Sequence, residues 1–319
     1  MLKNIGNTPM IKLEYRYKGK TNFIYSKLEY YNLTGSIKDR VAYYIINHAK
    51  NNGILKDGKT IIEATSGNTG ISLSALGAYF GHPVHIFMPD WASKERVQLM
   101  KSYGAEVTLV SRNQGGFKRA LKDAKELSLR TGGFLANQFA NMDNILAHYE
   151  TTGQEIVNQL PEDIGGFVSG VGTGGTLVGI GRKLKKINKG ITVTAIEPET
   201  MPLISKNRII GPHKIEGIGD DFVPALLDKN IIDKIFLIND NDAVNMSRIL
   251  AKKLGLGVGI SAGANVIGAV LLQEKINKPV VTVFADDNKK YLSTDLVKEI
   301  DENEAFISNN IELVGYEVI

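Results

Sequence analysis

The sequence contains no cysteine. Disulfides, zinc ribbons, iron–sulfur clusters and thiol nucleophiles are therefore absent. No apolar run approaches the roughly 20 residues that span a bilayer, and the first six residues lack the long apolar core of a signal peptide. We therefore expect a cytoplasmic protein with no membrane partner, and we predict no metal site.

The sequence also has no cluster of charges of one sign. The net charge is +4, and Lys and Arg alternate with Asp and Glu along the whole chain. Nucleic-acid binding needs clustered positive charge, so this distribution argues against a nucleic-acid partner. The 319 residues are 43% hydrophobic, which suits one large or two medium globular domains.

Short apolar runs alternate with helical patterns through the middle of the chain. Strands separated by helices of this length predict parallel sheets with helical crossovers, and hence an α/β protein with two domains that meet near residues 140–148. The first 34 residues could belong to either domain. The pattern predicts strands at residues 60–64, 83–88, 106–110, 166–169 and 191–197, and helices at residues 68–80, 93–103, 149–159 and 177–186.

Glycine is abundant at predicted strand-to-helix turns. The clearest such turn is Gly170-Val171-Gly172-Thr173-Gly174-Gly175-Thr176. Glycines let backbone N–H groups approach an anion, and a helix N-terminus adds partial positive charge, so a phosphate is the natural ligand. The alternative is a tight turn that binds nothing.

The same turn also matches the dinucleotide motif G-x-G-x-x-G at Gly170, Gly172 and Gly175. Glu197 follows at a strand end, where a dinucleotide enzyme keeps the acid that binds ribose. An NAD-dependent dehydrogenase is therefore an alternative, although it leaves the other glycine turns unexplained.

A second turn is Thr65-Ser66-Gly67-Asn68-Thr69-Gly70. Its hydroxyls, amide and N–H groups suit a small carboxylate, and the alternative is a simple helix N-cap. A third turn, Gly259-Ile260-Ser261-Ala262-Gly263, matches the nucleophile elbow of hydrolases. That interpretation fails because the catalytic histidine should follow the serine, whereas every histidine precedes Ser261: His48, His82, His85, His148 and His213.

Lys38 lies at the start of a predicted helix whose apolar stripe includes Val41, Ile45 and Ala49. Ser36 and Asp39 have the spacing of a loose capping box. A lysine in a first helical turn is unfavourable as a cation, so its pKa is lowered and the neutral amine needed for imine formation is favoured.

The order of these motifs resembles the cysteine synthase family, whose fold is the two-domain, three-layer αβα arrangement of fold type II enzymes. The similarity runs from Asn7-Thr8-Pro9 to Lys290-Tyr291-Leu292-Ser293-Thr294 and includes Glu216-Gly217-Ile218-Gly219. The resemblance implies pyridoxal 5′-phosphate in the cleft between the domains and a homodimer. It also implies a smaller domain at residues 35–143 with residues 1–11, and a larger one at residues 144–319 with residues 12–34.

By the same resemblance, Lys38 forms an imine with the cofactor and later acts as the base at Cα. Ser261 would hydrogen-bond the pyridine nitrogen, and a neutral hydroxyl there makes the ring a weaker electron sink, which favours β-elimination and β-replacement through an aminoacrylate. The other implied residues are Asn68 at the ring oxygen; Gly172, Thr173, Gly174, Gly175 and Thr176 at the phosphate; and Thr65, Ser66, Thr69 and Gln138 at the substrate carboxylate.

The sequence departs from the family at Asp220 and Asp221, where the family has small residues. Both aspartates could face solvent. A carboxylate in the cleft would instead repel hydrosulfide and act as a general base for water. This favours release of sulfide from L-cysteine with water as the nucleophile, giving L-serine. The alternative is biosynthesis of L-cysteine from O-acetyl-L-serine and sulfide.

Smaller departures are Leu33 and Ala64, which replace prolines and alter the stiffness of loops. The segment Phe284-Ala285-Asp286-Asp287-Asn288 is more acidic than is usual in the family. We therefore expect access of the substrate to differ.

Overall fold

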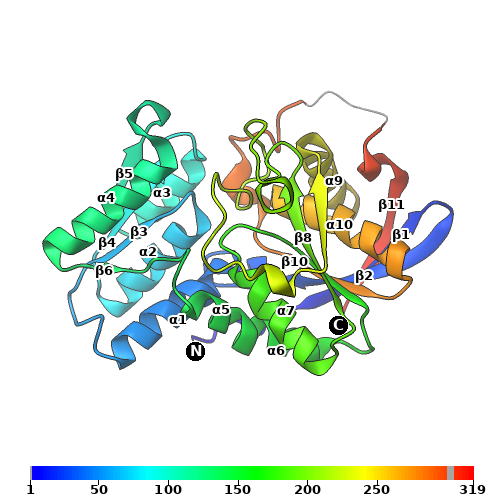
Figure 1. Ribbon diagram of the computed structural model, residues 1–319, viewed down its shortest axis with the longest axis horizontal. Helices are drawn as coiled ribbons and strands as arrows, with labels where there is room; N and C mark the ends of the chain where they lie inside the picture. Colours follow the sequence, from blue (N-terminus) through cyan, green and yellow to red (C-terminus); the bar gives the residue numbers. More distant parts are fainter. Residues whose placement is uncertain (1, 300–304) are drawn as a thin grey trace.

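The computed structural model describes residues 2–299 and 305–319, and the strands in these residues form two sheets (Figure 1). The smaller sheet has the order β5-β4-β3-β6 and is parallel throughout. Apolar side chains of α1, α2 and α3 pack on one face and those of α4 on the other. The strands are β3 Ile61–Ala64, β4 Val84–Pro89, β5 Glu106–Val110 and β6 Phe134–Leu135.

The larger sheet has the order β11-β1-β2-β10-β7-β8-β9. The run from β2 to β9 is parallel, whereas β1 lies antiparallel to both β2 and β11. Helices α9 and α10 cover one face, and α6 and α7 cover the other. The strands are β1 Met10–Tyr17, β2 Lys20–Leu28, β7 Gly166–Gly170, β8 Thr192–Pro198, β9 Lys234–Ile238, β10 Val280–Phe284 and β11 Ile311–Val318.

The helices connect these strands and complete the two three-layer halves, which we call the small half and the large half. Figure 1 shows the halves on opposite sides of the molecule, with α1 and α5 along the lower edge. The helices are α1 Lys38–Asn51, α2 Asn68–Phe80, α3 Lys94–Ser102, α4 Gly116–Thr131, α5 Asp143–Ala147, α6 Gly153–Gln159, α7 Gly175–Ile187, α8 Leu203–Lys206, α9 Asp240–Leu254 and α10 Ile260–Ile276.

The predicted α/β class with parallel sheets and helical crossovers is confirmed. Helix α2 and strand β5 have the predicted bounds, and the other predicted elements shift by one or two residues at most of their ends. The predicted helix at residues 149–159 differs more, because a π-helical turn at His148–Thr152 precedes α6. The sequence pattern did not identify the antiparallel strands β1 and β11 or helix α4.

Helix α1 begins at Lys38, as expected, but the capping box is wrong. The N-cap residue is Ile37, whose apolar side chain cannot cap the helix, and the Ser36 hydroxyl accepts the backbone N–H of Lys38 at 3.3 Å rather than that of Asp39. The Asp39 carboxylate instead accepts hydrogen bonds from the backbone N–H and the hydroxyl of Thr34, at 2.7 and 2.6 Å. Asp39 therefore fixes the turn before the helix, which orients the chain that carries Lys38.

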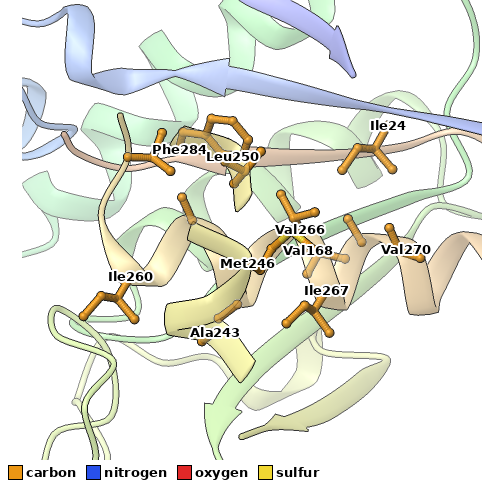
Figure 2. Close-up of a cluster of buried hydrophobic side chains, with 14 of the residues drawn as sticks. Ile24, Val168, Ala243, Met246, Leu250, Ile260, Val266, Ile267, Val270 and Phe284 are labelled. Carbon is orange, nitrogen blue, oxygen red and sulfur yellow. The ribbon is translucent and has the colours of Figure 1, made fainter. Parts of the chain in front are cut away.

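Helix α10 is buried over most of its length because it lies between the larger sheet and α9. Figure 2 shows Val266 and Ile267 of α10 among side chains from β2, β7 and α9. Close packing of its first turns against both neighbouring layers holds this part of the helix in place. Ser261, in its first turn, is held as firmly as the core itself.

No helix within the described residues is both long and apolar enough to cross a membrane. Residues 12–34 enter the larger sheet through β1 and β2. The exact domain bounds, the homodimer and the cytoplasmic location stay predictions, and Met1 and residues 300–304 lie outside the described residues.

A buried charge network joins the two halves at the base of α1. Arg40 pairs with Glu29 at 2.6 Å and with Glu155 of α6 at 2.6 Å, and the Arg40 side chain is fully buried. Lys27 of β2 pairs with Glu155 at 2.8 Å, so two positive and two negative charges balance. The Thr8 hydroxyl donates to Glu29 at 2.7 Å, which ties the N-terminal segment to the same network.

We expect Arg40→Met to lower the free energy of unfolding by about 3–5 kcal/mol, because the Glu29 carboxylate then stays buried without its salt-bridge partner, while Glu155 keeps only Lys27. Urea unfolding of the holoenzyme measures this loss. The control is Arg16→Met, which removes an exposed pair with Glu312 and should cost less than about 1 kcal/mol. Equal losses in the two variants would contradict the prediction.

Candidate active site

One cavity opens between the halves at the carboxyl ends of β3, β7 and β10, the edge where ligands bind in α/β proteins. Two of the predicted site residues, Gly175 and Asp221, are not among the residues that line it. The predicted residues that do line it are Lys38, Thr65, Ser66, Asn68, Thr69, Gln138, Gly172, Thr173, Gly174, Thr176, Asp220 and Ser261.

Lys38 reaches this cavity from the first turn of α1. Burial lowers the pKa of its amine to about 8, while Asp220 and Asp286 oppose this shift. The cause is therefore chiefly burial, where the sequence suggested the helix N-terminus. Within the described residues, the amine forms no hydrogen bond or salt bridge. An unpaired, partly neutral amine that lines a cavity can form an imine with an aldehyde.

The glycine turn before α7 has the shape of an anion cradle. A Cβ at Gly172 would lie 2.4 Å from the carbonyl oxygen of Gly217, so only glycine fits, and Gly174 has a left-handed φ of +86°. A Cβ at Gly175 would meet Asn144 instead, which places this glycine behind the cradle. The N-terminus of a helix with 13 residues completes a site for a phosphate.

Two side chains behind the glycine turn form hydrogen bonds with the hydroxyls of Thr173 and Thr176. The Asn144 amide donates to Thr173 at 2.9 Å, and His148 contacts the Thr176 hydroxyl through Nε2 at 3.2 Å. Burial, followed by the charges of Lys38 and Arg40, holds the pKa of His148 well below its usual value. His148 is therefore a neutral hydrogen-bonding partner of the turn.

The turn after β3 is more than a helix cap. Its N-cap residue is Gly67, which has no side chain to cap α2, so the alternative of a simple N-cap is wrong. The Thr69 hydroxyl donates to the Gln138 side chain at 2.6 Å, and the Gln138 amide donates to the Ala64 carbonyl at 3.1 Å. These bonds bring the Thr69 hydroxyl and the Gln138 amide, from two loops, to one corner of the cavity, where a small carboxylate would fit.

Among the cavity residues that the sequence interpretation missed as site residues are Arg96, Asp286 and Tyr291. Asp286 accepts hydrogen bonds from Asn68, at 2.7 Å, and from the Tyr291 hydroxyl. The guanidinium of Arg96 lies 4.5 Å from the centre of the Tyr291 ring. The acidic segment around Asp286 was the only sequence signal for this group, because Arg96 joins it from α3 in the other half.

The two unusual aspartates have different surroundings. Asp220 lines the cavity, and burial followed by the charge of Asp221 raises its pKa to about 6, against the effect of Lys38. Asp221 pairs with Lys118 of α4 at 3.5 Å, and its side chain is 40% exposed. The structure therefore distinguishes the two aspartates: Asp220 lines the cavity, and Asp221 does not.

These residues fit pyridoxal phosphate. The glycine turn suits its phosphate, the Lys38 amine its aldehyde, and the Ser261 hydroxyl its ring nitrogen. The Asn68 Oδ1 atom is buried without a hydrogen-bond partner among the described residues, as expected beside a polar ligand. Glu197, the ribose-binding acid of the dehydrogenase alternative, instead accepts the N–H groups of Ile204 and Ser205 at the start of α8.

Comparison with known proteins agrees with this fit. Residues 1–286 match the family of pyridoxal-phosphate dependent enzymes. A cysteine synthase of Staphylococcus aureus (strain Mu50) is 42% identical over 92% of this chain and 94% of its own. A cysteine synthase structure from Entamoeba histolytica has a TM-score of 0.87 at 39% identity, covering 97% of this chain and 93% of that one.

A hydrogen sulfide-producing enzyme of Fusobacterium nucleatum has a TM-score of 0.96 at 47% identity, covering 99% of this chain and 96% of that one. An aspartate-to-asparagine variant of a hydrogen sulfide-producing enzyme, solved with an α-aminoacrylate intermediate, has a TM-score of 0.95 at 48% identity, covering 98% and 95% of the two chains. These matches leave no place for a dehydrogenase. The chain belongs to the pyridoxal-phosphate dependent enzymes and, among them, to the cysteine synthase family.

Proposed function

We propose that this enzyme releases sulfide from L-cysteine and adds water at Cβ, giving L-serine. The reaction balances as L-cysteine plus water giving L-serine plus hydrogen sulfide, with no oxidation or reduction. The observation that carries the proposal is the Asp220 carboxylate in the cavity. The similarity to hydrogen sulfide-producing enzymes supports the same direction.

Lys38 serves the first half of this reaction. Bound pyridoxal phosphate supplies an electron-withdrawing ring that acidifies Cα of an attached amino acid and allows a group to leave from Cβ. The Lys38 amine takes the Cα proton, and its pKa of about 8 leaves part of the population neutral near neutral pH. Thr65, Ser66, Thr69 and Gln138 hold the substrate carboxylate.

Asp220 serves the second half. A base with a pKa of about 6 is ionised at neutral pH and still accepts a proton readily. It takes a proton from water as the water oxygen bonds to Cβ. The same negative charge repels hydrosulfide, so return of the leaving group is disfavoured.

Biosynthesis of L-cysteine from O-acetyl-L-serine and sulfide is the second candidate. The 42% identity to a cysteine synthase supports it, and the cofactor and carboxylate turns serve either direction equally. The two functions differ in what attacks Cβ, so only the residues around Asp220 distinguish them.

The deciding experiment supplies L-cysteine alone in 18O-labelled water and identifies the product by mass. We expect serine labelled at its hydroxyl, together with sulfide. Pyruvate alone would indicate a lyase, and a thioether-bridged amino acid would indicate exchange with a second cysteine. No product from cysteine, with turnover of O-acetyl-L-serine and sulfide, would restore the biosynthetic function.

The pH dependence of serine formation should report the ionisation of Asp220. The base is active only when deprotonated, so the rate should rise with pH through about 6. Asp221→Asn removes a neighbouring negative charge that raises this pKa, so the acidic limb should move to lower pH with the plateau retained. Rate profiles of both enzymes measure the shift, and coincident acidic limbs would contradict it.

A further inference from the structure

The segment Glu216–Phe222, here called the Asp220 loop, belongs to the large half but contacts the small half at both of its ends. At its first end, Arg96 of α3 forms a salt bridge with Glu216. The Arg96 side chain is 3% exposed, and a Cβ at Gly67 would lie 2.5 Å from its Cδ atom. Arg96 is thus wedged between the carboxylate turn, the Tyr291 ring and the Asp220 loop.

The other end is held by aromatic rings. Phe222 stacks near Phe117 of α4, with ring centroids 6.3 Å apart and an angle of 14°. It also meets Phe139 edge-on at 5.0 Å, and Phe139 lines the cavity beside Gln138. The Asp221–Lys118 pair lies at the same end, but it is long and solvent-exposed and contributes little, so the aromatic rings carry this contact.

Between these ends, the backbone is fixed to the large half. The Gly219 N–H donates to the Val171 carbonyl at 2.9 Å, and the His213 ring contacts the Gly219 carbonyl at 2.6 Å. Gly217 and Gly219 have φ values of +89° and +71°, so these bends require glycine. Asp220 follows immediately, between a fixed backbone and the aromatic contacts of Phe222.

We propose that Arg96 and Phe222 are positioning residues that hold the Asp220 carboxylate where it can activate water. This inference rests on the proposed function of Asp220. Each residue acts by fastening one end of the Asp220 loop to the small half. If either end is loosened, the carboxylate stays in the cavity but occupies a wider range of positions. Small displacements of a catalytic group lower the rate strongly.

The test separates water addition from sulfide release. Aminoacrylate that leaves the enzyme before water adds at Cβ hydrolyses to pyruvate and ammonia. The ratio of serine to pyruvate therefore reports how well the base is positioned. Phe222→Leu keeps apolar volume without the ring, and Glu216→Gln removes the charge that pairs with Arg96. With L-cysteine as substrate, we expect each variant to lower the ratio about fivefold to tenfold, with sulfide release within about twofold of the parent. Phe222→Tyr should keep the serine-to-pyruvate ratio of the parent, because it retains the aromatic ring.

The matched control is Phe23→Leu, which makes the same change in an aromatic pair of β2. Its ratio should equal that of the parent. Hydrogen exchange of residues 217–222 in the resting holoenzyme gives a second measurement that does not depend on the product. It should speed up roughly tenfold in Phe222→Leu and Glu216→Gln but not in the control.

The outcomes distinguish the two proposals. If a variant changes neither the hydrogen exchange of residues 217–222 nor the serine-to-pyruvate ratio, the residue pair that it disrupts has no positioning role. Asp220→Asn with the parent rate of serine formation would overturn Asp220 as the base. In that case, or if the parent forms no serine, hydrogen exchange alone decides whether Arg96 and Phe222 hold the loop.

Discussion

Replacement of Lys38 by alanine should lower the rate of sulfide release from L-cysteine by about 10³-fold or more. The variant loses both the covalent attachment of the cofactor and the base at Cα, and a positioned base alone contributes roughly 10²–10⁴. The phosphate cradle is untouched, so the cofactor should still bind, but without the visible absorbance of the imine. Stopped assays for sulfide and absorption spectra measure these two effects.

Two other buried lysines provide an internal control. The Lys27 amine is occupied by Glu155, and the Lys290 amine donates to the Gly35 carbonyl at 2.8 Å, whereas Lys38 opens into the cavity. Borohydride reduction followed by peptide mass analysis should therefore find the cofactor on Lys38 alone. Cofactor on Lys27 or Lys290, or an active Lys38→Ala enzyme, would refute the assignment.

Asp220→Asn should separate the two halves of the reaction. We expect serine formation to fall about 10²–10⁴-fold, because an amide cannot take a proton from water. Lys38 is retained, so the first equivalent of sulfide should still be released as a rapid burst before slow turnover begins. Rapid-quench measurement of sulfide, with mass analysis of serine and pyruvate, follows both halves in one experiment.

Asp221→Asn is the matched control for this variant. It makes the same chemical change one residue away, at a side chain that pairs with Lys118 outside the cavity lining. At pH 7.5 it should form serine at close to the parent rate. If it loses serine formation and Asp220→Asn does not, the roles of the two aspartates are reversed.

Local patterns predicted much of the fold because each half repeats one local unit. The bounds of α2 follow from an apolar strand, a turn of small residues and a helix, all adjacent in sequence. Strands β1 and β11 lie hundreds of residues apart in the chain, so no local sequence pattern could predict their pairing.

The site divides in the same way. The glycine turns and Lys38 are recognisable because each motif is contiguous. Arg96 is invisible as a site residue in the sequence, since its partners Glu216 and Tyr291 come from the other half. Asp220 and Asp221 are equivalent as neighbours in a sequence, and only the path of the backbone places one in the cavity and the other beside Lys118.

The strand order of the larger sheet constrains how the chain can fold during synthesis on the ribosome. Strand β2 is made early, yet its partner β10 begins only at Val280. The small half is nearly contiguous in the chain, whereas the N-terminal hairpin of β1 and β2 has an open edge until β10 is made. Such long-range pairing is slow and exposes strand edges to aggregation. A ribosome that stalls before residue 280 would therefore leave the edge of β2 without its partner strand.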